Sequence, residues 1–144
     1  MEIREATFND IPELISLMEQ LGYPTTVEKM EIRFNKIESN DTYHTIVAVT
    51  DRRVVGLLGM CTGLFYEYDG SYARILTLVV DSAYRKKGIG KKLIKEAENW
   101  ARNQGVFSIG LNSGNREERK EAHSFYSNLG YVAKSTGFAK TLLN

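Results

Sequence analysis

The feature that most limits how this chain can fold is an apolar run that leads through a basic, glycine-containing loop into an amphipathic pattern. Residues 73–80 predict a strand buried on both faces, and apolar side chains recur at helical spacing over residues 89–101. Gly88 and Gly90 lie at the junction. Because another apolar run follows at residues 106–111, the segment predicts two parallel strands joined by a crossover helix.

The rest of the chain predicts helices and strands on both sides of this crossover. Asp10 with Glu13, and Thr25 with Glu28, have the spacing of capping boxes and predict the starts of two amphipathic helices. A last helix is predicted over residues 118–129. Three helices are predicted to end at glycines: Gly22, Gly105 and Gly130.

The remaining segments are rich in β-branched and aliphatic residues. Strands are predicted at residues 3–6, 43–50 and 54–61, a loop at 62–70, and closing strands at 131–133 and 138–142. The order of elements predicts an α+β fold with a mixed, mostly antiparallel sheet flanked by helices and with one βαβ crossover. We expect a single domain over residues 1–144, since domains commonly have about 100–200 residues.

Charge and cysteine content exclude several classes of protein. The net charge of +1 lacks the strong basic bias of nucleic-acid-binding domains. The single cysteine, Cys61, permits neither an intrachain disulfide nor a cysteine-based metal site. No apolar stretch approaches the roughly 18 residues of a membrane span, and the N-terminus lacks the apolar region of a secretion signal. We therefore expect a soluble, cytoplasmic protein with no metal and with neither nucleic acid nor membrane as a partner.

The basic loop has the features of a phosphate-binding site. The start of a helix presents unpaired N–H groups and a partial positive charge, to which anions bind. Glycine lets the backbone approach a phosphate closely. Positive charge is concentrated at the same place by four residues: Arg85, Lys86, Lys87 and Lys91. The loop therefore predicts a pyrophosphate ligand; the alternative is a tight turn surrounded by solvated lysines.

Two common phosphate-binding motifs do not match this loop. The dinucleotide-binding fingerprint requires a third glycine at the position of Leu93. A Walker A loop requires serine or threonine at the position of Lys92, and an earlier glycine at the position of Arg85. The loop therefore fits neither motif.

Two motifs resemble those of the GNAT superfamily of N-acetyltransferases. Residues 85–90 (Arg-Lys-Lys-Gly-Ile-Gly) resemble the signature Arg/Gln-x-x-Gly-x-Gly/Ala, and residues 76–81 resemble the strand that precedes it in that family. Residues 122–131 resemble the pattern Ala-x-x-Phe/Leu-Tyr-x-x-x-Gly-Phe/Tyr. The two motifs occur in the family's order, and the resemblance extends in outline over the whole chain. It implies the GNAT fold, in which the central fourth and fifth strands splay apart.

The resemblance also implies acetyl-CoA as cosubstrate. Its pyrophosphate would bind backbone N–H groups of residues 86–91, and its pantetheine arm would pair with the backbone of Leu78 and Val80. An N–H near Leu78 or Val79 would polarise the thioester carbonyl. The implied cofactor-binding residues are Leu78, Val79, Val80, Arg85, Lys86, Lys87, Gly88, Ile89, Gly90, Lys91, Asn112, Arg119 and Tyr126.

The implied catalytic residue is Tyr126, which matches the family's general acid and would protonate the departing thiolate. Its spacing would also suit a packing role in the core. Many relatives carry an acidic base in the preceding strand, where this chain has Leu76 and Thr77. Glu67 and Asp69 in the loop before that strand, or a chain of water molecules, remain as alternatives for the base.

Other positions add detail to the resemblance. Arg119 replaces an asparagine common in relatives, and it is either a contact to the CoA phosphates or an exposed helix charge. His123 is expected to have a structural role. The acceptor site would lie near residues 21–24 and 65–69, whose aromatic and acidic side chains suit a cationic amine; the alternative is a tyrosine-rich loop that packs on the domain.

The expected function is transfer of an acetyl group from acetyl-CoA to a primary amine of a small molecule, a peptide N-terminus or a lysine, directly in a ternary complex. The alternative is a non-catalytic regulatory module that binds CoA or acyl-CoA. The missing strand acid favours that alternative, and the tyrosine at position 126 opposes it. Members of the superfamily often dimerise, which leaves a homodimer open.

Overall fold

The computed structural model describes residues 1–112 and 120–143. The chain divides into two compact units, Met1–Gly110 and Leu111–Asn144, and each is described by itself. Among the described residues, no helix is both long enough and apolar enough to span a membrane.

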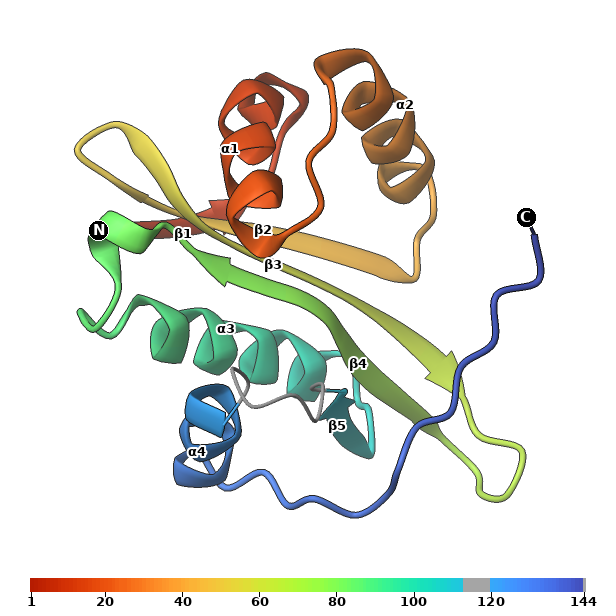
Figure 1. The fold of residues 1–144 in the computed structure, drawn as a ribbon. Helices are drawn as coiled ribbons and strands as arrows, with labels where there is room; N and C mark the ends of the chain where they lie inside the picture. The colour runs from red at the N-terminus through yellow and green to blue at the C-terminus, as the bar shows by residue number, and fades with distance from the viewer. Residues whose placement is uncertain (113–119, 144) are drawn as a thin grey trace. The chain divides into compact units, whose positions relative to one another are not determined.

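A five-stranded sheet forms the centre of the first unit (Figure 1). Its strands are, in spatial and sequence order, β1 (Glu2–Glu5), β2 (Tyr43–Thr50), β3 (Arg53–Leu64), β4 (Ser71–Val80) and β5 (Ser108–Leu111). The ladders from β1 to β4 are antiparallel. The Phe107 N–H, just before β5, donates to the Ser71 carbonyl at the start of β4, 2.7 Å away. Because the two strands start side by side, they run parallel, as the crossover predicts.

Helices cover both faces of this sheet. Figure 1 shows α1 (Ile11–Leu21) and α2 (Val27–Glu38) on one face and α3 (Ile89–Asn103) on the other. The first face is filled by side chains from both helices and from the sheet: Ala6, Ile11, Leu14, Leu17, Met18, Met30, Phe34, Val47, Val54, Leu57 and Val79. Two short 3-10 turns, Phe8–Asp10 and Ser82–Tyr84, precede α1 and follow β4. The predicted fold class, a mostly antiparallel α+β sheet with one crossover, is confirmed.

Three helices end as the glycines predict. Gly22, Gly105 and Gly130 adopt φ values of 103°, 74° and 91°, which side chains disfavour. In each case the glycine N–H and the N–H of the next residue bond back to carbonyls of the last helical turn. This is the Schellman arrangement, in which the turned chain satisfies carbonyls that the helix leaves free.

Two predictions about strands are wrong. Residues 131–143 contain no strand in the structure, so the closing strands at 131–133 and 138–142 are not formed. Alternation of side chains shows that a segment can be extended, but a strand also requires a paired neighbour. In addition, β3 continues to Leu64, and the loop before β4 therefore spans residues 65–70 instead of 62–70.

The expectation that β4 is buried on both faces is also wrong. Ala73, Ile75 and Val79 are buried, but Leu76 is 49% exposed. The β3–β4 register shifts at this point, since Gly59 pairs with Thr77 while Met60 pairs with Ile75, and Leu76 has no residue opposite. Such a bulge bends a strand and re-aims its side chains.

A substitution at Gly63 tests the close packing of β3 on β4. A Cβ at this position would lie 2.5 Å from the Tyr72 hydroxyl oxygen and 2.6 Å from its Cζ atom. We expect Gly63→Ala to lower the free energy of unfolding by about 1–3 kcal/mol in urea titration, because overpacking displaces the ring. Gly110→Ala is the control, since its Cβ would enter open space. Equal effects of the two substitutions would contradict the packing described.

Candidate active site

Within the first unit, the edge of β4 that faces β5 has no strand beside its second half. β5 has four residues against ten in β4, and the two strands start together. At about 3.3 Å per residue, a strand of this length reaches only the first half of β4. Within the first unit, β5 therefore does not cover the backbone from Leu76 to Val80.

Backbone direction decides which of the proposed β4 residues can use this open edge. The Asp81 N–H donates to the Val55 carbonyl on β3, 2.8 Å away. Backbone N–H and C=O groups alternate in direction along an antiparallel strand. The N–H and C=O of Val79, two residues before Asp81, therefore also point toward β3. The N–H and C=O groups of Leu78 and Val80 point the other way, toward the open edge, where the Val80 carbonyl already accepts a hydrogen bond from Arg85. The structure thus separates Leu78 and Val80, which can pair with a ligand, from Val79, whose side chain belongs to the core.

Hydrogen bonds from the side chains of Gln20, Asp81 and Arg85 hold the segment that follows β4. The Gln20 carboxamide of α1 accepts from the Ser82 N–H at 2.8 Å and donates to Asp81 Oδ2 at 3.3 Å. Asp81 Oδ1 accepts from the Ala83 N–H at 2.9 Å. Arg85 Nε donates to the Val80 carbonyl at 3.1 Å, which ties the loop to the last residue of β4. These contacts fix the loop that leads from the open edge to α3.

The start of α3 presents backbone donors at the end of that loop. The first backbone hydrogen bond of α3 runs from the Lys92 N–H to the carbonyl of Gly88, 3.1 Å away. The N–H groups of Ile89, Gly90 and Lys91 therefore have no acceptor within the helix. Gly88 is the N-cap residue, and no side chain caps the helix. These three N–H groups are consequently available to an anion.

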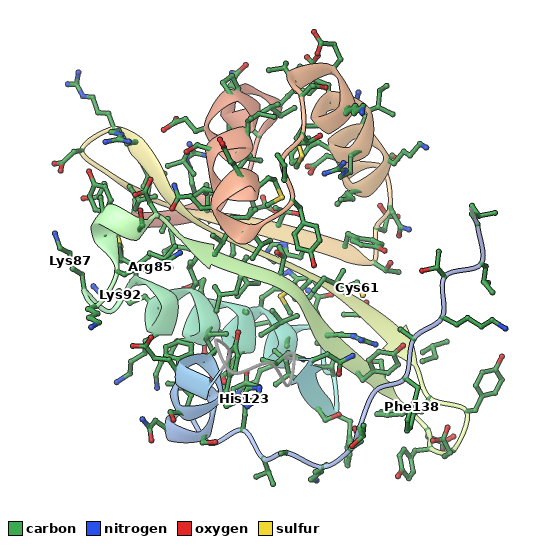
Figure 2. All side chains as sticks on the ribbon, in the orientation of Figure 1. Cys61, Arg85, Lys87, Lys92, His123 and Phe138 are labelled. Carbon is green, nitrogen blue, oxygen red and sulfur yellow. The ribbon has the colours of Figure 1, made fainter. Side chains whose placement is uncertain are left out.

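Cations surround this helix start (Figure 2). The side chains of Arg85, Lys86, Lys87 and Lys91 are all exposed, and the ion pairs recorded among the described residues involve none of them. Lys86 adopts a φ of 63°, a conformation that non-glycine residues rarely take and that concentrates at functional sites. The Lys87 ammonium lies 5.4 Å from the centre of the Tyr84 ring. Free N–H groups and uncompensated positive charge together suit a pyrophosphate.

A substitution at Gly88 separates this role from general stability. Gly88 has a φ of +82°, and a Cβ there would meet nothing within 4 Å. Gly105, at the other end of α3, has a φ of +74° and the same open surroundings. We expect Gly88→Ala and Gly105→Ala each to cost about 1 kcal/mol of stability, because the left-handed conformation crowds Cβ. Only Gly88→Ala should weaken acetyl-CoA binding in calorimetric titration; unchanged affinity would contradict the pyrophosphate assignment.

The remaining predicted residues belong to the second unit. Tyr126 lies in α4 (Lys120–Asn128), half-buried, with its ring centre 5.3 Å from that of Phe125 and 6.2 Å from that of Tyr131. Asn112 follows β5 and is exposed. Arg119 lies outside the described residues. Within this unit, the motif's glycine at position 130 ends α4, so part of the second motif is a helix-stop signal.

β4 contains no aspartate or glutamate that could act as the general base found in this strand of many relatives. Leu76 is the exposed bulge residue, and the partly exposed Thr77 follows it. Glu67 and Asp69 are exposed in the loop of residues 65–70. In that loop Phe65 packs edge-to-face on Tyr68, with ring centres 5.0 Å apart. The loop therefore supplies carboxylates and aromatic rings together at the end of the sheet where β4 begins.

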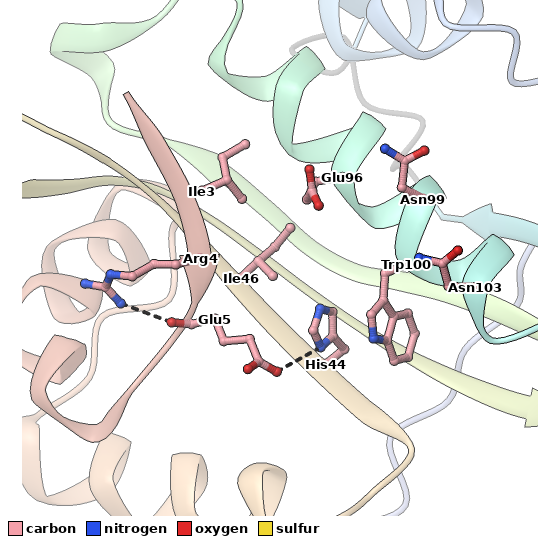
Figure 3. A pocket seen from close by; sticks show the side chains of 9 residues that line it. All are labelled: Ile3, Arg4, Glu5, His44, Ile46, Glu96, Asn99, Trp100 and Asn103. Atoms are coloured by element: carbon pink, nitrogen blue, oxygen red, sulfur yellow. Dashed lines mark hydrogen bonds and ion pairs between the residues drawn. The ribbon is translucent and has the colours of Figure 1, made fainter.

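One side-chain arrangement has no signal in the sequence: His44 of β2 stacks on Trp100 of α3 (Figure 3). The ring centres are 4.3 Å apart and the planes differ by 3°. The two residues are far apart in sequence, and neither position has a motif. Only the packing of α3 on the sheet brings them together.

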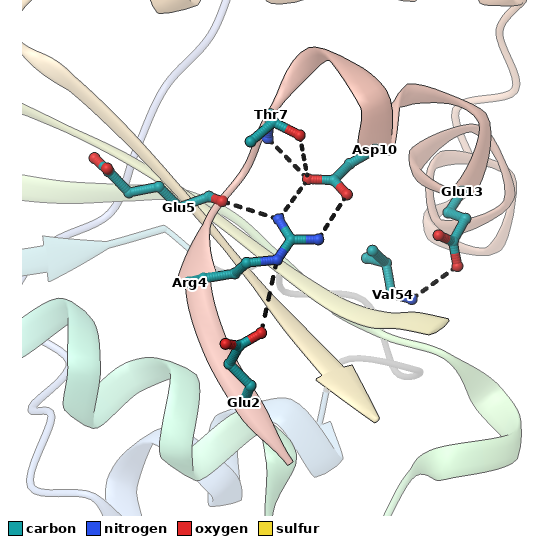
Figure 4. Close-up of polar contacts among 7 residues, drawn as sticks. All are labelled: Glu2, Arg4, Glu5, Thr7, Asp10, Glu13 and Val54. Atoms are coloured by element: carbon teal, nitrogen blue, oxygen red, sulfur yellow. Dashed lines mark hydrogen bonds and ion pairs between the residues drawn. The ribbon is translucent and has the colours of Figure 1, made fainter. Parts of the chain in front are cut away.

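A second arrangement corrects the predicted capping boxes (Figure 4). Asp10 accepts from the Thr7 N–H at 2.8 Å and from both terminal nitrogens of Arg4, at 2.8 and 2.9 Å. Glu13 does not complete a box with Asp10; its carboxylate accepts from the Val54 N–H at 2.7 Å. The capping box thus starts one turn earlier than predicted. The cap of α2 is likewise one residue later than predicted, at position 26, where the threonine hydroxyl accepts from the N–H three residues on.

Comparison with known proteins agrees with this geometry. The model of the Acetyltransferase (GNAT) family matches residues 9–131. The crystal structure of a GNAT family acetyltransferase from Staphylococcus aureus is similar with a TM-score of 0.86 and 35% identity, over 98% of this chain and 98% of that one.

Two curated relatives are similar over most of their lengths. An uncharacterized N-acetyltransferase of Bacillus subtilis, YhdJ, is 28% identical over 95% of this chain and 92% of its own. Glucosamine 6-phosphate N-acetyltransferase 1 of Oryza sativa is 26% identical over 92% of this chain and 82% of its own. With a family match over most of the sequence and the same fold as a family member, this chain belongs to the GNAT family of acetyltransferases.

Proposed function

We propose that the protein transfers the acetyl group of acetyl-CoA to a primary amine. The observation that carries the proposal is the adjacency of two features: an open β4 edge with outward-pointing backbone groups at Leu78 and Val80, and a helix start with three free N–H groups and no capping side chain. The first suits the amide-bearing pantetheine arm and the second suits the pyrophosphate.

The chain's own residues have distinct roles in this reaction. Acetyl-CoA supplies the activated acetyl group. The Leu78 N–H, which points to the open edge, would hydrogen-bond the thioester oxygen; Val79 does not suit this role, because its N–H faces β3. As the amine nitrogen forms its bond to the acetyl carbon, the carbon–sulfur bond breaks, and the nitrogen gives one proton to water or to a carboxylate of the loop at residues 65–70, from which solvent can restore the proton that Tyr126 gives up. Tyr126 would return a proton to the sulfur, giving the free thiol of CoA.

The acceptor amine is proposed by class. The name of the Oryza sativa relative specifies an amino sugar phosphate, and amines in general bind where carboxylates and aromatic rings meet. The loop of residues 65–70 offers both. We propose a small-molecule primary amine as acceptor, with a peptide N-terminus and a lysine side chain as the further candidates.

The test is release of free thiol from acetyl-CoA in the presence of a panel of amines. The panel contains glucosamine 6-phosphate, lysine and a short peptide with a free N-terminus. We expect at least one amine to raise thiol release above the amine-free rate, with the acetylated product identified by mass. Binding of acetyl-CoA without release for any amine would favour the alternative, a non-catalytic CoA-binding module.

A further inference from the structure

A pocket of about 250 Å³ lies at the β1 edge of the sheet, beside the second half of α3 (Figure 3). Its walls are β1 and β2 on one side and the second half of α3 on the other. The side chains that matter for its chemistry are Glu5, His44, Glu96, Asn99, Trp100 and Asn103. None of them has a role in the proposed acetyl transfer.

α3 turns a polar stripe toward this pocket. Glu96, Asn99 and Asn103 recur at spacings of three and four residues, so they share one face of the helix. The adjacent stripe, which includes Leu93 and Ala97, is fully buried against the sheet. One stripe of α3 therefore packs in the core, and the adjacent stripe presents hydrogen-bonding side chains to the pocket.

An aromatic pair, His44 and Trp100, belongs to the lining of the pocket. The His44 imidazole is stacked on the Trp100 indole, and its side chain is only 13% exposed. Burial lowers the pKa of His44 below its ordinary value of 6.5, against the opposing effect of Glu5, Glu38 and Glu96. At neutral pH the imidazole is therefore mainly uncharged and does not repel a cation.

Two of the side chains that line the pocket, Glu5 and Glu96, are carboxylates. Glu5 has one ion-pair partner among the described residues, the weakly basic His44 at 3.6 Å, and Glu96 has none. The lining guanidinium of Arg4 is already bonded to Asp10 and to the Glu5 carbonyl, 3.0 Å away. Two carboxylates thus face the space without a committed cation. Beyond Ile3 and Glu96 the surface becomes basic, with Lys91, Lys92 and Lys95 lining a neighbouring hollow.

We propose that this pocket binds a small organic cation, an alkylamine or guanidinium compound, between the carboxylates of Glu5 and Glu96 with its apolar part against the His44–Trp100 pair. Carboxylates form charge-assisted bonds to such cations, aromatic faces attract them, and the Asn103 amide adds an acceptor, whereas the Asn99 oxygen already accepts from Arg102 at 3.1 Å. The volume is that of roughly eight water molecules at about 30 Å³ each, which suits a small ligand. This site is independent of the acetyl-transfer reaction.

The chain contains its own reporter for this site, because Trp100 is the only tryptophan. The experiment is a fluorescence titration of the full-length protein with agmatine, which carries both an amine and a guanidinium, against sodium chloride at matched ionic strength. We expect a saturable change in Trp100 emission with agmatine alone. The double variant Glu5→Gln, Glu96→Gln should lose the change; both side chains are exposed, so it should fold normally.

A matched control removes one carboxylate elsewhere. Glu28→Gln lies on α2, on the opposite face of the sheet, and should keep the full response. A response that persists in the double variant would mean that agmatine acts at another site, such as the acceptor site. No response in the wild-type protein at millimolar agmatine would also overturn the proposal. Neither result bears on acetyl-CoA binding, so the proposed function is tested separately.

Discussion

Replacing Tyr126 with phenylalanine is expected to lower kcat about 100-fold or more, which is the usual effect of losing a general acid. The substitution removes one oxygen and keeps the ring, so the edge-to-face contacts with Phe125 and Tyr131 are preserved. Because the hydroxyl is proposed to act on the departing sulfur, acetyl-CoA affinity should stay nearly constant. Steady-state kinetics with the best amine, together with calorimetric titration of acetyl-CoA, measure both quantities.

A matched change is available in the same unit. Tyr131→Phe removes the same atom from a ring whose centre is 6.2 Å away. It should leave kcat almost unchanged, since Tyr131 follows the helix stop and has no proposed chemical role. If both variants lost turnover and stability in parallel, Tyr126 would be a packing residue and the general-acid assignment would be wrong.

Asp10→Asn is expected to have the largest effect on stability, about 3 kcal/mol at neutral pH. Asp10 is 5% exposed and accepts two hydrogen bonds from Arg4 (Figure 4). Removing one member of a buried pair commonly costs about 3–5 kcal/mol; the Arg4 side chain is 35% exposed, so water compensates part of its charge and the expected cost is at the lower end of that range. Asparagine fills the same space but cannot accept both charged bonds. Urea unfolding of the variant and the wild type measures the difference.

The pH dependence identifies the cause of that difference. Hydrogen bonding to Arg4 is the main reason why the pKa of Asp10 is lowered from its ordinary value of 3.8. A carboxyl with a lowered folded-state pKa stabilises the protein above its unfolded-state pKa, and loses that contribution as pH falls through the folded-state pKa. The gap between wild type and Asp10→Asn should therefore be constant near pH 7 and shrink below about pH 4. A gap that stays constant into acid would mean that the carboxylate charge is not its source.

The parts of the fold that depend on local chemistry could be predicted from sequence. Gly22, Gly105 and Gly130 end helices because each adopts a conformation that side chains disfavour. The run into α3 predicted the crossover, since an apolar strand, a glycine loop and a periodic helix follow one another directly. The basic glycine motif at residues 85–90 also indicated the loop that connects β4 to α3 in the structure.

The parts that depend on distant partners could not be predicted. The bulge at Leu76 arises from the register of β4 on β3, which no short motif encodes. Glu13 had the spacing of a capping residue, but a backbone N–H on β3, far away in sequence, takes its carboxylate. The stack of His44 on Trp100 likewise exists only because α3 packs on the sheet. In each case the arrangement depends on contacts with residues far away in the sequence, which the local sequence does not specify.

Thermal unfolding with acetyl-CoA, CoA, ATP and NAD tests the central claim most directly, namely that the open β4 edge and the start of α3 bind a CoA thioester. A ligand at about 100 times its Kd stabilises the folded state by roughly 2.7 kcal/mol. For a domain of this size that corresponds to a rise in Tm of about 5–10 °C. We expect this rise with acetyl-CoA and CoA and little with ATP or NAD. No rise with either CoA compound at millimolar concentration would contradict the claim.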